Sequence, residues 1–154
     1  MFNKKILFVI FVILSIFVLS TIWYLASSLF LDKSVDEEFP VNLVDGNNET
    51  NKILFQGEFI DADSFHKVSG KAIVIQEEDE KYLRFENFQS TNGPDLKVYL
   101  SEDLSASSYI SLGELKGNIG NQNYELDEVD LEKYNYVLIW CEQFSVLFGS
   151  ADLN

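Results

Sequence analysis

The sequence predicts an all-β fold, an antiparallel β-sandwich or barrel of about eight strands, preceded by one N-terminal transmembrane helix. Three observations predict this fold class. The N-terminus carries a long uncharged apolar run; short apolar stretches separated by turn residues follow it; and no further stretch with a helical period appears. The 13 phenylalanines and seven tyrosines can fill the core of a small domain that has only one cysteine.

The N-terminal apolar run covers residues 6–31 and holds 26 residues without a charge. As a helix it would exceed the roughly 30 Å hydrocarbon core of a bilayer, so some tilt is expected. Trp23 and Tyr24 suit a membrane interface near its far end. We therefore expect residues 1–31 to form a signal-anchor whose residues 6–31 contact the lipid bilayer.

The charges around this run predict its orientation. Lys4 and Lys5 precede it, which favours a cytoplasmic N-terminus and a single-pass protein of the cell membrane with an extracytoplasmic C-terminal domain. A cleaved secretory signal is the alternative, because residues 26–28 are small enough for a signal peptidase. Both alternatives place the domain outside the cytoplasm.

The remainder of the chain is strongly acidic. Two of the 11 basic residues precede the apolar run and all 25 acidic residues follow it, which leaves a net charge of −16. Such a domain would be repelled by nucleic acid, so we expect no nucleic-acid partner. Residues 32–51 are polar, acidic and weakly periodic, and we expect a linker there. Residues 48–50 fit the acceptor pattern for N-glycosylation. Residues 52–154 are the expected β domain.

Short apolar stretches within residues 52–154 predict the strands in order. Each stretch alternates or is apolar on both faces, and each is bounded by glycine, asparagine, aspartate or a run of charges. The expected strands are 53–60, 71–76, 82–88, 96–100, 109–112, 121–126, 136–141 and a last strand within 144–153.

The turn chemistry is clearest between the third and fourth expected strands. Asn92, Gly93, Pro94 and Asp95 predict a turn in which glycine adopts a positive φ, proline fixes φ and Asp95 bonds nearby backbone amides. A calcium site that uses Asp95 is a weaker alternative, since the ligand spacing of an EF-hand loop is missing.

The densest apolar stretch after the membrane run is residues 136–153, which predicts a hairpin with Glu142 and Gln143 as a two-residue turn. Residues 136–141 are apolar on both faces, which is typical of a central, covered strand. This strand ends in Cys141, so we expect the thiol near the rim of the fold.

Cys141 and His66 are the only cysteine and histidine in the chain, and they are the candidate site residues. One cysteine cannot form an internal disulfide or hold an iron–sulfur cluster, and no Cys/His cluster for zinc exists. Four roles are open for Cys141: a buried structural thiol, a reactive thiol, a soft metal ligand, or half of an intermolecular disulfide. His66 either bonds within a turn or binds a metal or haem iron. The residues alone leave these alternatives open, and they name no cofactor.

Six motifs in order resemble the DM13 domain family. They cover about residues 55–153 and comprise His-Lys-Val-Ser-Gly at 66–70, Phe-Glu-Asn-Phe at 85–88, Thr-Asn-Gly-Pro-Asp-Leu at 91–96, Leu-Gly-Glu-Leu-Lys-Gly-Asn at 112–118, Gly-Asn-Gln-Asn-Tyr at 120–124 and Ile-Trp-Cys-Glu-Gln-Phe at 139–144.

The resemblance implies a β-fold in an extracellular or membrane-anchored protein, sometimes beside DOMON domains, and a role in electron transfer centred on the cysteine of the Trp-Cys motif. That cysteine is Cys141 here. We therefore expect a redox accessory of a membrane system rather than a stand-alone enzyme. Two alternatives remain: a cell-surface binding or adhesion module in which Cys141 is only structural, and an envelope structural protein.

Overall fold

The computed structural model describes residues 3–27, 31–40, 51–77, 79–126 and 128–154. The chain divides into two units, residues 1–31 and 32–154. The described residues of the first unit contain one helix, α1 (Lys4–Ala26), whose N-terminus is capped by the Asn3 side chain accepting from the Lys5 amide. Between Lys4 and Tyr24 this helix is long and apolar enough to cross a membrane. Because a signal sequence has the same properties, α1 is either an anchor or a signal.

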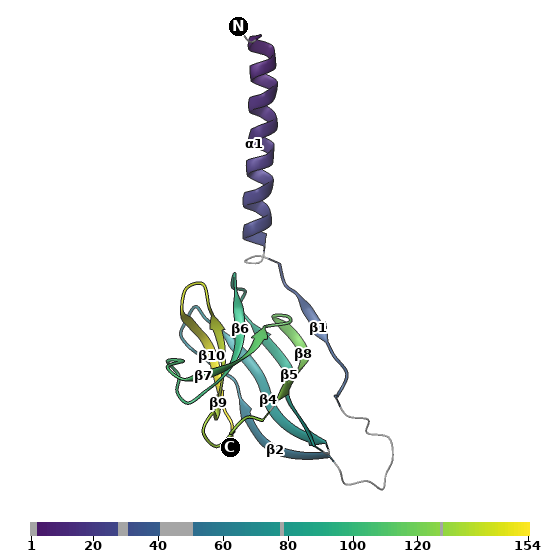
Figure 1. The fold of residues 1–154 in the computed structure, drawn as a ribbon, viewed down its shortest axis with the longest axis vertical. Helices are drawn as coiled ribbons and strands as arrows, with labels where there is room; N and C mark the ends of the chain where they lie inside the picture. The colour runs from purple at the N-terminus through teal and green to yellow at the C-terminus, as the bar shows by residue number, and fades with distance from the viewer. Residues whose placement is uncertain (1–2, 28–30, 41–50, 78, 127) are drawn as a thin grey trace. The chain divides into compact units, whose positions relative to one another are not determined.

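The second unit is mostly β, with ten strands among its described residues that form two five-stranded sheets (Figure 1). The first sheet has the order β1-β8-β5-β4-β2 and the second the order β3-β10-β9-β6-β7. The strands are β1 (Ser34–Asp36), β2 (Asn51–Glu58), β3 (Ile60–Asp61), β4 (Val68–Glu77), β5 (Glu80–Ser90), β6 (Leu96–Ser101), β7 (Tyr109–Glu114), β8 (Ile119–Leu126), β9 (Tyr136–Cys141) and β10 (Val146–Asp152).

One core lies between the two sheets. Alternate side chains of β4 and β5, such as Val74 and Phe85, meet alternate side chains of β6 and β9, such as Val98 and Ile139, in a single buried cluster. This packing follows from strand geometry, because every second residue points to the same face. It confirms the predicted sandwich-like β architecture.

The sequence prediction is wrong about two features of this architecture. The fold has more strands than the eight expected, because β1 and the two-residue β3 were missed. It is also not wholly antiparallel, since β1 pairs in parallel with β8, with Val35 opposite Gly120. Residues 34–36 are polar and lie in the stretch expected to be a linker, so no apolar pattern marks them as a strand. The triplet at 48–50 lies outside the described residues.

The β9–β10 hairpin differs from its prediction in the length of its turn. Cys141 pairs with Val146, so four residues, 142–145, form the turn instead of two. Ser145, the last residue of this turn, has a positive φ of 53°. In the predicted two-residue turn, only Glu142 and Gln143 would have had turn conformations, and Ser145 would have been part of the strand. β9 lies between β10 and β6, which confirms that it is a central strand of its sheet.

Candidate functional site

Cys141 is the last residue of β9 and lies at one end of the sandwich. It pairs with Leu96, the first residue of β6, and with Val146, the first residue of β10. Its residue surface is 1% exposed, and it belongs to the apolar cluster between the sheets. The turn beyond it continues the ladder, since the Glu142 amide donates to the Asp95 carbonyl over 2.9 Å. The thiol is therefore a free but enclosed group close to a rim.

Three of the family-like motifs lie together at this same end, joined by backbone hydrogen bonds from Thr91 and from Ser90, the residue before the 91–96 motif. The Thr91 amide donates to the Lys67 carbonyl over 2.9 Å, and the Ser90 amide donates to the Asn118 carbonyl over 2.8 Å. Residues 91–95 then cross from the first sheet to Leu96 in the second. The fold thus brings three distant stretches of sequence to the end of the core where Cys141 lies.

Asp32 joins two asparagines of these motifs. Its Oδ1 accepts from the side-chain amides of Asn92, at 2.9 Å, and Asn118, at 2.8 Å. The Lys33 amide donates to the Asn118 side chain over 2.6 Å. Nothing in the spacing of the acidic stretch that begins at residue 32 predicts these contacts. Asp32 is thus a residue of this end of the domain that sequence reasoning missed.

The packing at this end of the domain leaves no room for a side chain at Gly93. A Cβ at Gly93 would lie 2.8 Å from a Leu96 methyl carbon and 2.9 Å from Phe148 Cζ. It has no positive φ, so the conformational role predicted for it is wrong. The predicted role of Asp95 is not observed either, because its side chain pairs with Lys97 Nζ at 2.9 Å. Close packing beside the rim explains the glycine instead.

His66 lies at the same end but is held in a different way. Its Nδ1 is 2.7 Å from Asp63 Oδ2, and its ring lies 4.4 Å from the Phe148 ring, centroid to centroid. Phe148 belongs to the core cluster that contains Cys141. Among the described residues no hydrogen bond joins His66 to Cys141. The structure therefore brings both predicted site residues to one end, where His66 packs on a ring of the core cluster that contains Cys141.

The contact with His66 changes the pKa of the Asp63 carboxyl group. Hydrogen bonds from the His66 ring, then from the His66 and Phe65 amides, lower the pKa of Asp63 from 3.8 to about 2. An ionised carboxylate that holds Nδ1 leaves Nε2 as the ring nitrogen that can meet a ligand, which is the arrangement typical of metal-bound histidines. Within the described part of the chain, no three His, Cys, Asp or Glu side chains form a metal-binding group.

A second set of side chains lies on the outer face of the second sheet, the face opposite the core in which Cys141 is buried. Trp140, Tyr99 and Tyr109 are aligned across three strands, with ring centroids 6.5 Å and 4.1 Å apart and nearly parallel planes. The Tyr99 hydroxyl donates to Glu142 Oε1 over 3.2 Å. Lys97 Nζ lies 3.8 Å from the other oxygen of that carboxylate. Burial, followed by the charge of Glu142, raises the pKa of the Tyr99 phenol above its usual value.

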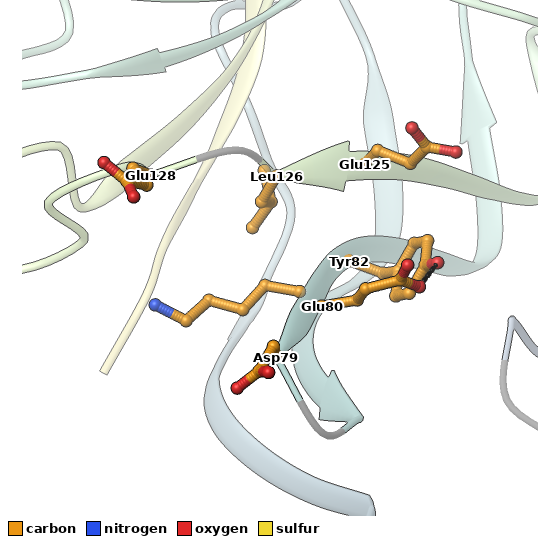
Figure 2. Close-up of a pocket in the computed structure, with 7 residues that line it drawn as sticks. Asp79, Glu80, Tyr82, Glu125, Leu126 and Glu128 are labelled. Atoms are coloured by element: carbon orange, nitrogen blue, oxygen red, sulfur yellow. Dashed lines mark hydrogen bonds between the residues drawn. The ribbon is translucent and has the colours of Figure 1, made fainter.

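A group of carboxylates lines a cleft elsewhere on the domain. An open cleft of about 380 Å³ is lined by residues at the start of β5 and at the end of β8, including Glu80, Glu125 and Glu128. Figure 2 shows Glu125 and Glu128 at opposite sides of this cleft. Because β5 and β8 are antiparallel, the cleft lies at the end of the first sheet away from Ser90 and Asn118. These carboxylates diverge, so the cleft does not resemble a cation site.

Together these features define a class: a β-sandwich protein with an N-terminal apolar helix and a single enclosed thiol at one end of the sandwich. A family model described as electron transfer DM13 matches residues 58–153, which is more than half of the chain. The chain belongs to the DM13 family, and the resemblance noted in the sequence is confirmed. Neither the curated proteins nor the solved structures gave a match.

Proposed function

We propose that this protein is a membrane-anchored, extracytoplasmic DM13 domain that serves electron transfer as an accessory of a membrane redox partner, with Cys141 as its redox residue. The observation that carries the proposal is the match to the electron-transfer family model, whose range includes the only cysteine of the chain. The convergence of three motif segments at the end where Cys141 lies supports it further.

The burial of the thiol restricts its chemistry. A lone thiol can be oxidised to a sulfenic acid, or can form a mixed disulfide with an external thiol, but either reagent must reach the sulfur. Cys141 is enclosed among apolar side chains, so neither reagent reaches the sulfur in the closed structure. Local unfolding of the turn 142–145 would expose the sulfur with the fewest strand pairs broken, because Cys141 is the last paired residue before that turn.

The test measures whether Cys141 is oxidised without global unfolding. The full-length protein in detergent micelles is treated with hydrogen peroxide and a sulfenic-acid trap, and the adduct is quantified by mass spectrometry. We expect Cys141 to be trapped faster than the slowest-exchanging amides of β9 exchange with deuterium. Cys141→Ala gives the background. The matched control is Ser90→Cys in the Cys141→Ala chain, because Ser90 Oγ is also buried and has no hydrogen-bond partner among the described residues.

Two outcomes would overturn the redox role. One is trapping of Cys141 only at the rate of global unfolding; the other is equal trapping of Ser90→Cys, which would show that any buried thiol at this end reacts. Either result would leave Cys141 as a structural residue of the core.

His66 is our proposed cofactor-binding residue, through Nε2. The support is the Asp63 contact to Nδ1 and the partial exposure of the ring, whose side chain is 30% accessible. Titration of the full-length protein with haem, followed by absorbance, tests the proposal. We expect binding that is lost in His66→Gln and kept in Cys141→Ala. Equal binding by His66→Gln would contradict it.

A binding or adhesion module is the second candidate, and one observation favours it. Phe65 is 82% exposed and Phe144 is 64% exposed, although large aromatic side chains are usually buried. Both lie in loops next to candidate site residues. If surface attachment is the function, Phe65→Ser and Phe144→Ser should reduce attachment of cells that display the protein, whereas Cys141→Ala should not.

The membrane topology can be tested separately. We expect the mature protein to keep its full mass and a C-terminal tag to be accessible to antibody on intact cells, as an uncleaved anchor requires. A mature mass that lacks the first 26 to 28 residues would indicate a cleaved signal instead.

A further inference from the structure

The outer face of the second sheet carries an aromatic series that the core does not require. Tyr109 in β7 is 45% exposed, whereas Tyr99 in β6 is 2% exposed and stacks on it at 4.1 Å with an interplanar angle of 18°. Trp140 in β9 follows at 6.5 Å and 28°. The series therefore runs from solvent to the residue that precedes Cys141 in the chain.

Neighbouring aromatic rings are the side chains best suited to pass a single electron, because their π systems are readily oxidised and electron tunnelling weakens steeply with distance. Packing alone explains part of this arrangement, since cross-strand ring pairs stabilise sheets. It does not explain the hydrogen bond at the centre of the series. There the buried Tyr99 hydroxyl donates to Glu142 Oε1 over 3.2 Å. Lys97 Nζ, which pairs most closely with Asp95 at 2.9 Å, lies 3.8 Å from the same Glu142 carboxyl group.

A phenol that gives up an electron becomes a strong acid, so its oxidation is favoured where a base can accept the proton at once. Tyr99 has such a base in Glu142. Tyr109, by contrast, has its exposed ring at the surface, where a partner can approach. The three residues thus have separate roles: Tyr99 is oxidised, Tyr109 carries the electron outward, and Glu142 accepts the proton.

We propose that Tyr99 is a redox-active residue of this protein, that its electron leaves through Tyr109 to a one-electron metal oxidant on a partner protein, and that its phenolic proton passes to Glu142. In this step the oxidant gains one electron, the O–H bond of Tyr99 breaks, and a neutral tyrosyl radical and a protonated Glu142 result. Return of one electron, through Trp140 or from solution, restores the phenol as the proton moves back. The inference deepens the proposed electron-transfer function and rests on it.

The test generates the oxidant photochemically. Full-length protein in detergent micelles is illuminated with tris(bipyridine)ruthenium(II) and persulfate, frozen, and examined by electron paramagnetic resonance. We expect a tyrosyl radical that is largely lost in Tyr99→Phe and reduced in Glu142→Gln, which keeps the size of the side chain but removes the base. Tyr134→Phe is the matched control, because among the described residues its hydroxyl bonds Lys133 and no carboxylate, and it should keep the signal.

Additional variants separate electron transfer from folding. Tyr99→Phe keeps the ring stack, and near-ultraviolet circular dichroism checks that the domain is intact. If it does not fold, Tyr109→Leu removes only the exposed ring and should still lower the radical yield. An unchanged yield in Tyr99→Phe, or in both Tyr109→Leu and Glu142→Gln, would overturn the proposal.

The same measurement in Cys141→Ala separates this inference from the function on which it rests. A Tyr99 radical in Cys141→Ala supports the aromatic path even if Cys141 proves to be structural. Conversely, trapping of Cys141 at the wild-type rate in Tyr99→Phe would uphold the redox role of the thiol and show that its oxidation does not use this path.

Discussion

At the scale of single residues, Cys141 shows how a sequence can identify a position without deciding its chemistry. Its place before a turn and the apolar residues around it predicted a rim position in a covered strand, and both are observed. Whether the sulfur reacts depends on opening of the surrounding structure, which residue order does not encode. The redox role therefore stays a prediction.

Because Cys141 is buried, different substitutions of it should lower the free energy of unfolding by different amounts. Cys141→Ser places a hydroxyl among apolar side chains and should lower the free energy of unfolding by about 1–3 kcal/mol, the range for an unsatisfied buried hydroxyl. Cys141→Ala introduces no polar atom and should cost less. Urea denaturation of both variants measures the difference. A Ser variant as stable as wild type would show that the site is wetter or more polar than its 1% exposure indicates.

Asp63 gives a prediction about pH. Its pKa is lowered to about 2 in the folded state from 3.8, so the carboxylate contributes stability that is fully present above pH 3.8. That contribution is lost as the pH falls through 3.8 toward 2, because the unfolded state binds the proton in this range while the folded carboxylate stays ionised. The stability difference between wild type and Asp63→Asn should be constant near neutral pH and should shrink over this window. Denaturation at stepped pH measures it, and a constant difference down to pH 2 would contradict it.

At the scale of elements, the strongly patterned strands were predictable and the weakly patterned ones were not. Residues 96–100 alternate, and they form β6 with Val98 and Leu100 in the core. β1, in contrast, contains only Val35 as an apolar residue, and tertiary contacts hold it in place. Nearby, Arg84 Nη1 donates to the carbonyls of Glu37 and Glu38 at 3.3 Å and 3.2 Å. Contacts between residues so far apart leave no local signal.

The attachment of β1 depends on Gly120. This glycine has a φ of +108°, and a Cβ there would lie 1.9 Å from the Val35 carbonyl oxygen. Gly120→Ala should therefore detach β1, because the added Cβ would collide with the Val35 carbonyl oxygen. The backbone conformation itself adds a separate cost of roughly 1–2 kcal/mol for alanine. Hydrogen–deuterium exchange of residues 34–36 should rise.

Gly113→Ala is the control for this change. Gly113 has a similar φ of +98°, but a Cβ there would meet no atom within 4 Å. Gly113→Ala therefore has the cost of alanine at a positive φ but no collision between the added Cβ and a neighbouring atom. Slow exchange in residues 34–36 of both variants would show that Gly120 does not secure β1.

At the scale of the whole molecule, the two units are separate in their internal contacts, with residues 32–154 holding the entire core. A chain of residues 32–154 should therefore fold without α1, and its midpoint of urea denaturation should match that of the full-length protein in micelles. A chain that begins at residue 41 should be less stable, because it lacks β1 and the Glu37–Lys116 ion pair at 2.9 Å. Equal stability of the two shortened chains would contradict a structural role for residues 32–40.

The contacts of Asp32 have a mechanical consequence. Any tension along the chain between α1 and the domain arrives first at residue 32, whose carboxylate is held by Asn92 and Asn118. Those two asparagines lie in the loops that close the Cys141 end of the core. If α1 is retained as an anchor, force applied through it would load that end before any other part of the sandwich, and would shear these two hydrogen bonds before the strand pairs.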